Sequence, residues 1–191
     1  MTWPSPDAFV KTLGSSNDVE LAISAWNNED MYIPSKGQFI ASWALKNLLK
    51  NKQSQLDERI WVLLESILLS KATPPPWLST VLFKTPVVPI LTAILRRCTN
   101  NDAEPYSKNM LASCQRVLGE VLPLVYPRTR FETTLECFWA ALEASSEHPN
   151  VKSISKLIKL AVEGLRMAFV KATNKAKVGE SFMSVCVLTT V

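Results

Sequence analysis

Histidine transfers protons near neutral pH more readily than other side chains, and this chain has only one, His148. His148 precedes Pro149 in a segment that predicts a turn, so we expect a solvated turn residue rather than a general acid or base. A Ser-His-Asp triad would have to use this histidine, and no Gly-x-Ser-x-Gly nucleophile elbow is present. A small helical enzyme is therefore the weakest of the hypotheses considered.

Phosphate-binding loops need closely spaced glycines, because only glycine lets the backbone approach the phosphate groups closely. The five glycines lie far apart, at positions 14, 37, 119, 164 and 179. The adjacent carboxylates Asp57 and Glu58 fall in the first turn of a predicted helix, where the helix dipole stabilises negative charge. We therefore expect no nucleotide site, no catalytic carboxylate pair and no cofactor.

The four cysteines are Cys98, Cys114, Cys137 and Cys186. No two of them have the spacing of metal ligands, and Cys-x-x-Cys is absent. The first three fall inside helical patterns beside apolar residues, where a free cysteine packs as a small hydrophobic side chain. We expect these three to be buried, reduced and free of metal, as suits a reducing compartment.

A row of cations near the end of the sequence is the candidate macromolecule-binding face. Lys152, Lys156, Lys159 and Arg166 follow one another at spacings of 4, 3 and 7, which places them on one side of a helix. Residues 150–180 carry seven basic and two acidic side chains, whereas the chain as a whole carries a net charge of +4. The row could follow an acidic surface such as RNA, or it could be an ordinary solvated helix face.

Tryptophan is abundant, with six residues at positions 3, 26, 43, 61, 77 and 139. Core packing is expected for those within or beside apolar stripes, namely Trp26, Trp43, Trp61 and Trp139. Trp3 and Trp77 lie near prolines, and we expect them to be exposed anchors for a partner. Stacking on RNA bases has little support, because the basic helix contains no aromatic residue except Phe169.

Helices must position these side chains. Apolar residues recur at helical spacing along most of the chain, and no segment alternates long enough to predict a strand. Helix starts are predicted at Ser5, Asp18, Ser35 and Ser107, whose side chains can cap the first turn. The clearest inward stripe comprises Leu56, Ile60, Leu63, Leu64, Ile67 and Leu68.

Two further inward stripes are predicted nearer the end of the chain. The helix predicted from Thr129 to Ser146 should bury Phe131, Leu135, Phe138, Trp139 and Leu142. The helix predicted from about Val151 to Thr173 should bury Ile154, Leu157, Ile158, Ala161, Val162, Leu165 and Ala168.

The sequence thus predicts an all-α fold, an α-solenoid-like array of about eight antiparallel helices without a fixed sequence repeat. We expect a helical N-terminal domain at 1–178 and a tail at 179–191 that belongs to a truncated next element. The N-terminal segment does not resemble a signal peptide, and apolar runs fall short of the ~20 residues that a membrane span needs. We therefore expect a soluble protein of the nucleus or cytosol.

A resemblance to a known family runs through residues 19–71, about a quarter of the chain. The stretches that carry it are Leu21-Ala22, Ala25-Trp26, Tyr32-Ile33-Pro34-Ser35-Lys36, Trp43-Ala44, Asp57-Glu58-Arg59-Ile60-Trp61 and Ile67-Leu68-Leu69-Ser70. In order and spacing they resemble the N-terminal region of the unhealthy ribosome biogenesis protein 2 family, nucleolar factors of early large-subunit assembly. A weaker similarity continues at Val125-Tyr126-Pro127-Arg128 with Phe131.

The resemblance implies a non-enzymatic helical scaffold of the nucleolus that takes part in ribosome biogenesis and rRNA processing on early large-subunit (pre-60S) particles. It implies as partners other assembly factors, including a companion helical scaffold and a DEAD-box helicase, together with precursor ribosomal RNA and no membrane. No active-site residue carries over. Members of the family are far longer than this chain, and their C-terminal region has no counterpart in it. The alternative is a generic helical-repeat adaptor that binds proteins alone and is unrelated to ribosome assembly.

Overall fold

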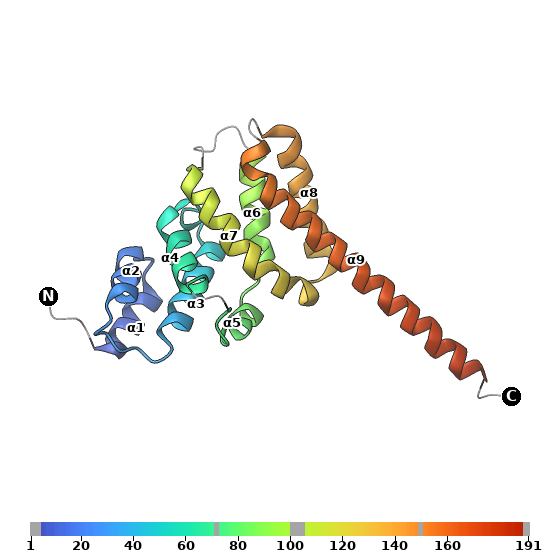
Figure 1. Ribbon diagram of the computed structural model, residues 1–191, viewed down its shortest axis with the longest axis horizontal. Coiled ribbons are helices and arrows are strands. Elements are labelled where there is room, and N and C mark those ends of the chain that lie inside the picture. The colour runs from blue at the N-terminus through green and yellow to red at the C-terminus, as the bar shows by residue number, and fades with distance from the viewer. Residues whose placement is uncertain (1–4, 71–72, 100–105, 149–150, 189–191) are drawn as a thin grey trace.

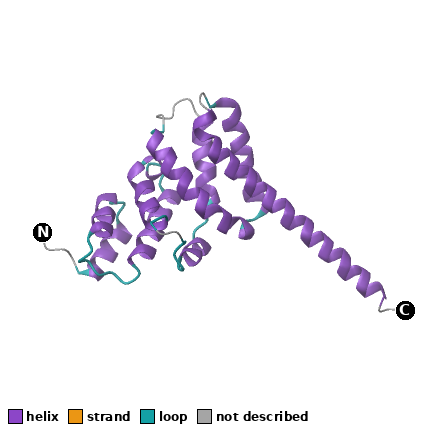
Figure 2. Cartoon of the chain, viewed as in Figure 1, coloured by secondary structure: helices purple, strands orange, loops and turns teal. Residues whose placement is uncertain are grey.

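A computed structural model describes the backbone of residues 5–70, 73–99, 106–148 and 151–188, and the side chains of these ranges up to residue 174 except Pro6. Within these ranges the chain forms nine α-helices, two short 3-10 helices and no strand, which confirms the predicted all-α array (Figure 2). The count exceeds the expected eight by one.

The helices follow one another with short connections (Figure 1). The first half contains α1 (Pro6–Ser15), α2 (Val19–Asn27), α3 (Lys36–Lys50), η1 (Ser54–Leu56), α4 (Glu58–Leu68) and α5 (Leu78–Lys84). The second half contains α6 (Val88–Thr99), α7 (Lys108–Val125), η2 (Tyr126–Arg128), α8 (Phe131–Glu147) and α9 (Val151–Leu188).

Polar caps begin several of these helices as predicted. Ser5, Asp18 and Ser107 each accept a hydrogen bond from the backbone N–H three residues later, at 3.3, 3.0 and 3.0 Å. Each cap satisfies a donor that has no partner within its own helix. The start sites of α1, α2 and α7 are therefore confirmed.

Helix α3 begins directly after Ser35, as predicted, but Ser35 does not cap it with its side chain, so that part of the prediction was wrong. Its backbone is left-handed, with φ of 53°, and its hydroxyl makes no capping bond. The start of α3 is fixed instead by Lys36, whose Nζ donates to the backbone oxygens of Ala25 at 2.9 Å and Asn28 at 2.6 Å. A lysine thus connects the end of α2 to the start of α3.

Helix α4 contributes a continuous stripe to the core. Its buried side chains are Ile60, Trp61, Leu63, Leu64, Ile67 and Leu68, and Leu64 is completely buried, as the stripe predicted. This face packs against α7 and α3. Helices α6, α8 and α9 form a second group, which contacts α7 mainly through α9 and also through α6. The packing is therefore not strictly sequential, because α4 meets α7 and α6 meets α8 across intervening helices.

Helix α8 is rotated relative to the prediction. Its buried residues are Thr134, Cys137, Ala140, Ala141 and Ala144. Trp139 is 57% exposed, and Leu142 is also exposed. Because α8 packs on α6 and α9 at once, small side chains at the contact let both neighbours approach closely. Of the five residues predicted to be buried, Phe131, Leu135 and Phe138 are half-buried, so the prediction was wrong for Trp139 and Leu142.

Helix α9 is longer than predicted and extends away from the other helices (Figure 1). Its backbone continues through Leu188, so residues 179–188 continue this helix where the sequence predicted a separate tail. Residues 189–191 lie outside the described ranges. On its first turns Ile154, Leu157 and Ala161 are buried as expected, whereas Val162 is exposed.

Among the described helices, no single one is both long enough and apolar enough to span a membrane. Within the described ranges, one pair, α5 and α6 taken together, has the length and composition of a span, and these two helices are bent by 67° relative to one another.

Candidate macromolecule-binding surfaces

The four predicted cations on α9 are all exposed, as the spacing indicated. Lys152, Lys156, Lys159 and Arg166 lie on the side of α9 opposite the buried residues. At 1.5 Å per residue the row is roughly 21 Å long. Helix α9 holds it in place because its other side packs against α8 and α7.

The charge of this row is not uniform. Arg166 donates two hydrogen bonds to Glu163, with Nε–Oε2 at 2.7 Å and Nη2–Oε1 at 2.6 Å. The hydrogen bond from Arg166 lowers the pKa of the Glu163 carboxyl, so both groups stay charged and largely offset one another. Within the described part of the chain, Lys152, Lys156 and Lys159 form no ion pair. The uncompensated positive charge therefore lies in the first three turns of α9.

Exposed apolar side chains on the α8–α9 pair are a feature that sequence reasoning missed. Trp139 and Leu142 are exposed on α8, and Val162 and Phe169 are exposed on α9. The ring of Phe169 meets that of Phe131 edge to face, with centroids 5.3 Å apart, which ties the two helices together near the start of α8. The pair thus presents apolar surface as well as the cations.

The sequence did contain a signal for Val162. It lies three residues after Lys159 and four before Arg166, the same spacing that placed the cations on one face. A residue between two outward-facing positions at these intervals must itself lie near that face. Apolarity alone therefore misassigned it to the core.

The tryptophans divide differently from the prediction. Trp43 and Trp61 are buried as expected, and Trp26 is half-buried. Trp77, predicted to be an exposed anchor, packs against the core near Gly37 on α3, so that prediction was wrong. Trp3, the other predicted anchor, lies outside the described residues.

The three cysteines that the structure describes with their side chains are buried and free of disulfides. Burial raises the pKa of Cys98 and of Cys137 to about 11, and it raises that of Cys114 further. These thiols are therefore protonated near neutral pH, which makes them poor nucleophiles. In the described ranges no group of His, Cys, Asp and Glu side chains is arranged to hold a metal ion, and the side chain of Cys186 lies outside them.

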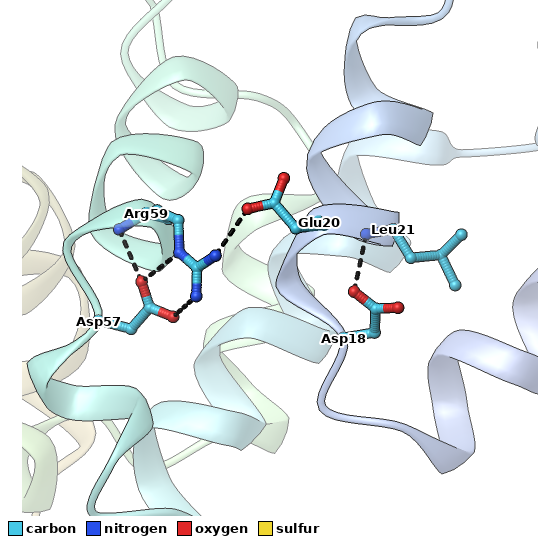
Figure 3. A network of polar contacts seen from close by, with 5 residues as sticks. All are labelled: Asp18, Glu20, Leu21, Asp57 and Arg59. Carbon is cyan, nitrogen blue, oxygen red and sulfur yellow. Dashed lines mark hydrogen bonds and ion pairs between the residues drawn. The ribbon is translucent and has the colours of Figure 1, made fainter.

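Asp57, one of the two adjacent carboxylates, belongs to a network of polar contacts between α2 and α4 (Figure 3). Asp57 is the N-cap of α4 and pairs with Arg59 at 2.7 Å, and Arg59 reaches Glu20 of α2 at 2.6 Å. The contacts join α2 to α4 at the surface.

His148 is the half-buried C-cap residue of α8, and its backbone N–H donates to the backbone oxygen of Ala144.

The exposed cations of α9 and the exposed apolar side chains of α8 and α9 are therefore candidate binding surfaces. No protein-family model, curated protein or solved structure matches this chain.

Proposed function

We propose that this chain is a non-enzymatic helical scaffold that binds assembly factors or precursor ribosomal RNA of the large ribosomal subunit in the nucleolus. The observation that carries the binding role is the exposed, unpaired row of Lys152, Lys156 and Lys159 on a helix held by packing on its opposite side. The ribosomal setting, with a companion helical scaffold and a DEAD-box helicase as partners, rests on the resemblance of residues 19–71 to the family of nucleolar factors.

Folding does not require such a row. Exposed ion pairs contribute only about 0–1 kcal/mol, and like charges at helical spacings of three and four repel one another slightly. A row of cations without carboxylate partners is instead suited to a polyanion, because binding phosphates releases condensed counterions.

A role without catalysis agrees with the chemistry of the described side chains. The buried thiols are protonated, and the carboxylates of Asp57 and Glu163 are held by neighbouring arginines. These carboxylates have partners within the fold, which supports the proposal of a scaffold.

One observation favours a second candidate, an adaptor that binds proteins alone. Trp139, Leu142, Val162 and Phe169 are exposed on the α8–α9 pair, and exposed aromatic side chains often anchor protein interfaces. Salt separates the two candidates. RNA binding should weaken with a log–log slope of about 0.7 per phosphate contact, so replacing the three unpaired lysines should reduce the slope by roughly 2.

The test in cells replaces Lys152, Lys156, Lys159 and Arg166 by glutamate and follows the variant through a density gradient of cell extract. The matched control replaces four exposed lysines elsewhere, Lys11, Lys46, Lys52 and Lys108, also by glutamate, which changes the net charge equally. Circular dichroism shows first that both variants keep the wild-type helix content and melting temperature.

We expect the α9 variant to leave the fractions that hold large-subunit precursors while the control stays in them. Equal co-migration of both variants with those precursors would rule out the α9 row as the binding surface. Loss of both would show that only net charge matters, which would also contradict the proposal.

A further inference from the structure

A hollow of about 470 Å³ opens on the surface where four helices meet. Its walls come from the end of α5, the start of α6, the end of α7 and the start of α8. The walls are mainly apolar, and they include Leu82, Phe83, Val87, Leu124 and Val125. This volume lies within the range of about 300–1,000 Å³ that is usual for ligand pockets.

The mouth of the hollow exposes large apolar side chains. Phe83 is 76% exposed and Leu124 is 45% exposed. The guanidinium of Arg128 lies 5.8 Å from the centre of the Phe83 ring, a cation–π contact that covers one face of the ring. The hollow therefore has an apolar interior and a cation at its edge.

A second, smaller hollow of about 300 Å³ shares this edge. Both hollows are lined by Arg128, Thr129 and Arg130, and the second adds Lys171, whose Nζ donates to the backbone oxygen of Pro127 at 2.8 Å. Its one carboxylate is Glu132. Arg128 and Arg130 therefore lie at the edge that the two hollows share, and Lys171 adds a third cation in the second hollow.

Among the described residues, Arg128 and Arg130, like Arg97, lack the carboxylate partners that the four remaining arginines of the chain have. Ion pairs with aspartate or glutamate are formed by Arg59, Arg96, Arg116 and Arg166. Across the ranges that the structure describes, neither Arg128 nor Arg130 forms one. Their charges are therefore available to a partner that brings its own carboxylates.

We propose that these two adjoining hollows bind an acidic peptide segment of a partner protein. A leucine or phenylalanine of the peptide sits in the larger hollow against Leu82 and Leu124. Carboxylates next to that anchor pair with Arg128 and Arg130, whose planar guanidinium groups can bind carboxylates through two parallel hydrogen bonds. The site is separate from the α9 row and does not depend on the function proposed for that row.

The shape of the larger hollow favours a peptide over RNA. Phosphates could satisfy the arginines, but the concave aliphatic walls fit a branched or aromatic side chain and offer no flat platform for a base. The only ring at the mouth, Phe83, already has Arg128 over one face. This leaves at most one open aromatic face, whereas proteins that bind single-stranded nucleic acid stack successive bases on several aromatic side chains.

The test selects peptides from a random dodecapeptide phage library on the whole purified chain. The most enriched peptide is then labelled with fluorescein, and its Kd is measured by fluorescence polarisation. We expect enriched peptides to combine one large apolar residue with at least two nearby carboxylates. Selection of basic peptides, or of none above background, overturns the proposal.

Two matched pairs of variants locate the site. Replacing Arg128 and Arg130 by glutamate should weaken the peptide about tenfold or more, while the same change at Lys46 and Lys108 should not. Leu124→Asp should also weaken it, whereas Val62→Asp, at a similarly exposed apolar residue of α4 (47% against 45%), should leave the affinity unchanged. Melting temperatures confirm that each variant is folded.

The outcomes separate this inference from the proposed function. The fourfold glutamate variant of the α9 row should bind the peptide as wild type does, even if it loses pre-ribosomal particles. Unchanged peptide affinity in the Arg128/Arg130 variant overturns the inference. A second result would also overturn it: a fluorescein-labelled single-stranded RNA dodecamer displaces the peptide and loses affinity in the same variants. The site would then bind nucleic acid.

Discussion

Asp57 has two roles at the start of α4. Its Oδ1 accepts a hydrogen bond from the backbone N–H of Arg59 at 3.0 Å, and its Oδ2 pairs with the guanidinium of the same residue at 2.7 Å (Figure 3). The side-chain hydrogen bond from Arg59 lowers the pKa of the Asp57 carboxyl, even though partial burial acts in the opposite direction. The sequence explains Asp57 by the helix dipole alone. It does not predict the contact with Arg59, although Arg59 is only two residues away.

This lowered pKa gives a pH-dependent prediction. Asp57→Ala should reduce the free energy of unfolding by about 0.5–2 kcal/mol at pH 7, the usual cost of losing an N-cap. The folded-state pKa lies below the unfolded value of about 3.9, so the contribution is complete above that pH and is lost as the pH falls through the folded pKa. Urea unfolding at pH 7 and pH 3 should therefore show a smaller difference at pH 3. A difference that stays constant with pH contradicts this role of the carboxylate.

A substitution at Leu64 tests the predicted core at the scale of a single residue. It is completely buried in α4, whereas Val62 on the same helix is exposed. Leu64→Ala should lower the free energy of unfolding by about 2–5 kcal/mol through lost burial and the cavity left behind. Val62→Ala should change it by no more than about 0.5 kcal/mol. Comparable effects in chemical denaturation would mean that the inward face of α4 is misassigned.

At the scale of the helix, the apolar periodicity predicted where helices form better than it predicted which face of each helix is buried. Helix α4 has one wide apolar stripe and one buried side, so its periodicity identified the right face. Helix α8 has a row of small residues on one side and large apolar residues on another, and the small residues lie inside. A helix that packs between two neighbouring helices buries small side chains, because these let both neighbours approach closely. Which face this is depends on the tertiary packing and cannot be predicted from the sequence of one helix.

The contact between η2 and α9 shows how close such packing becomes. Tyr126 is buried, and its hydroxyl donates to the backbone oxygen of Leu160 at 2.6 Å. The ring lies against Gly164, where an added Cβ would be 2.6 Å from Tyr126 Cζ. Gly164 is thus required by the neighbouring ring rather than by its own backbone conformation.

Two glycine substitutions should consequently have opposite signs. Gly164→Ala should destabilise the fold, because overpacking costs about 1–3 kcal/mol and exceeds the gain of at most about 1 kcal/mol in helix propensity. Gly119→Ala in α7 meets no atom within 4 Å, so it should stabilise the fold by about 0.5–1 kcal/mol. Differential scanning calorimetry of both variants measures the signs. A stabilised Gly164→Ala variant would show that Tyr126 can move aside.

At the scale of the whole molecule, the two candidate surfaces differ in how far the sequence predicts them. The α9 row lies within one helix, so spacing alone placed Lys152 and Lys159 on the outer side. The pair of hollows is built from residues between Ser79 and Ala172 on five helices, including α9. No local pattern connects Phe83 with Arg128, and only the packing of α5 against α7 brings them together.

The projecting end of α9 predicts the dimensions of the molecule in solution. A compact chain of 191 residues has a radius of gyration of roughly 16 Å, whereas a helix of 38 residues is roughly 57 Å long. Because α9 extends beyond the helices it packs against (Figure 1), small-angle X-ray scattering should give a radius of gyration clearly above the compact value. Truncation after Asn174 should lower it without changing the melting temperature, since the backbone at the end of α9 extends away from the other helices (Figure 1). A full-length value equal to the truncated one would mean that the end of α9 folds back onto the array.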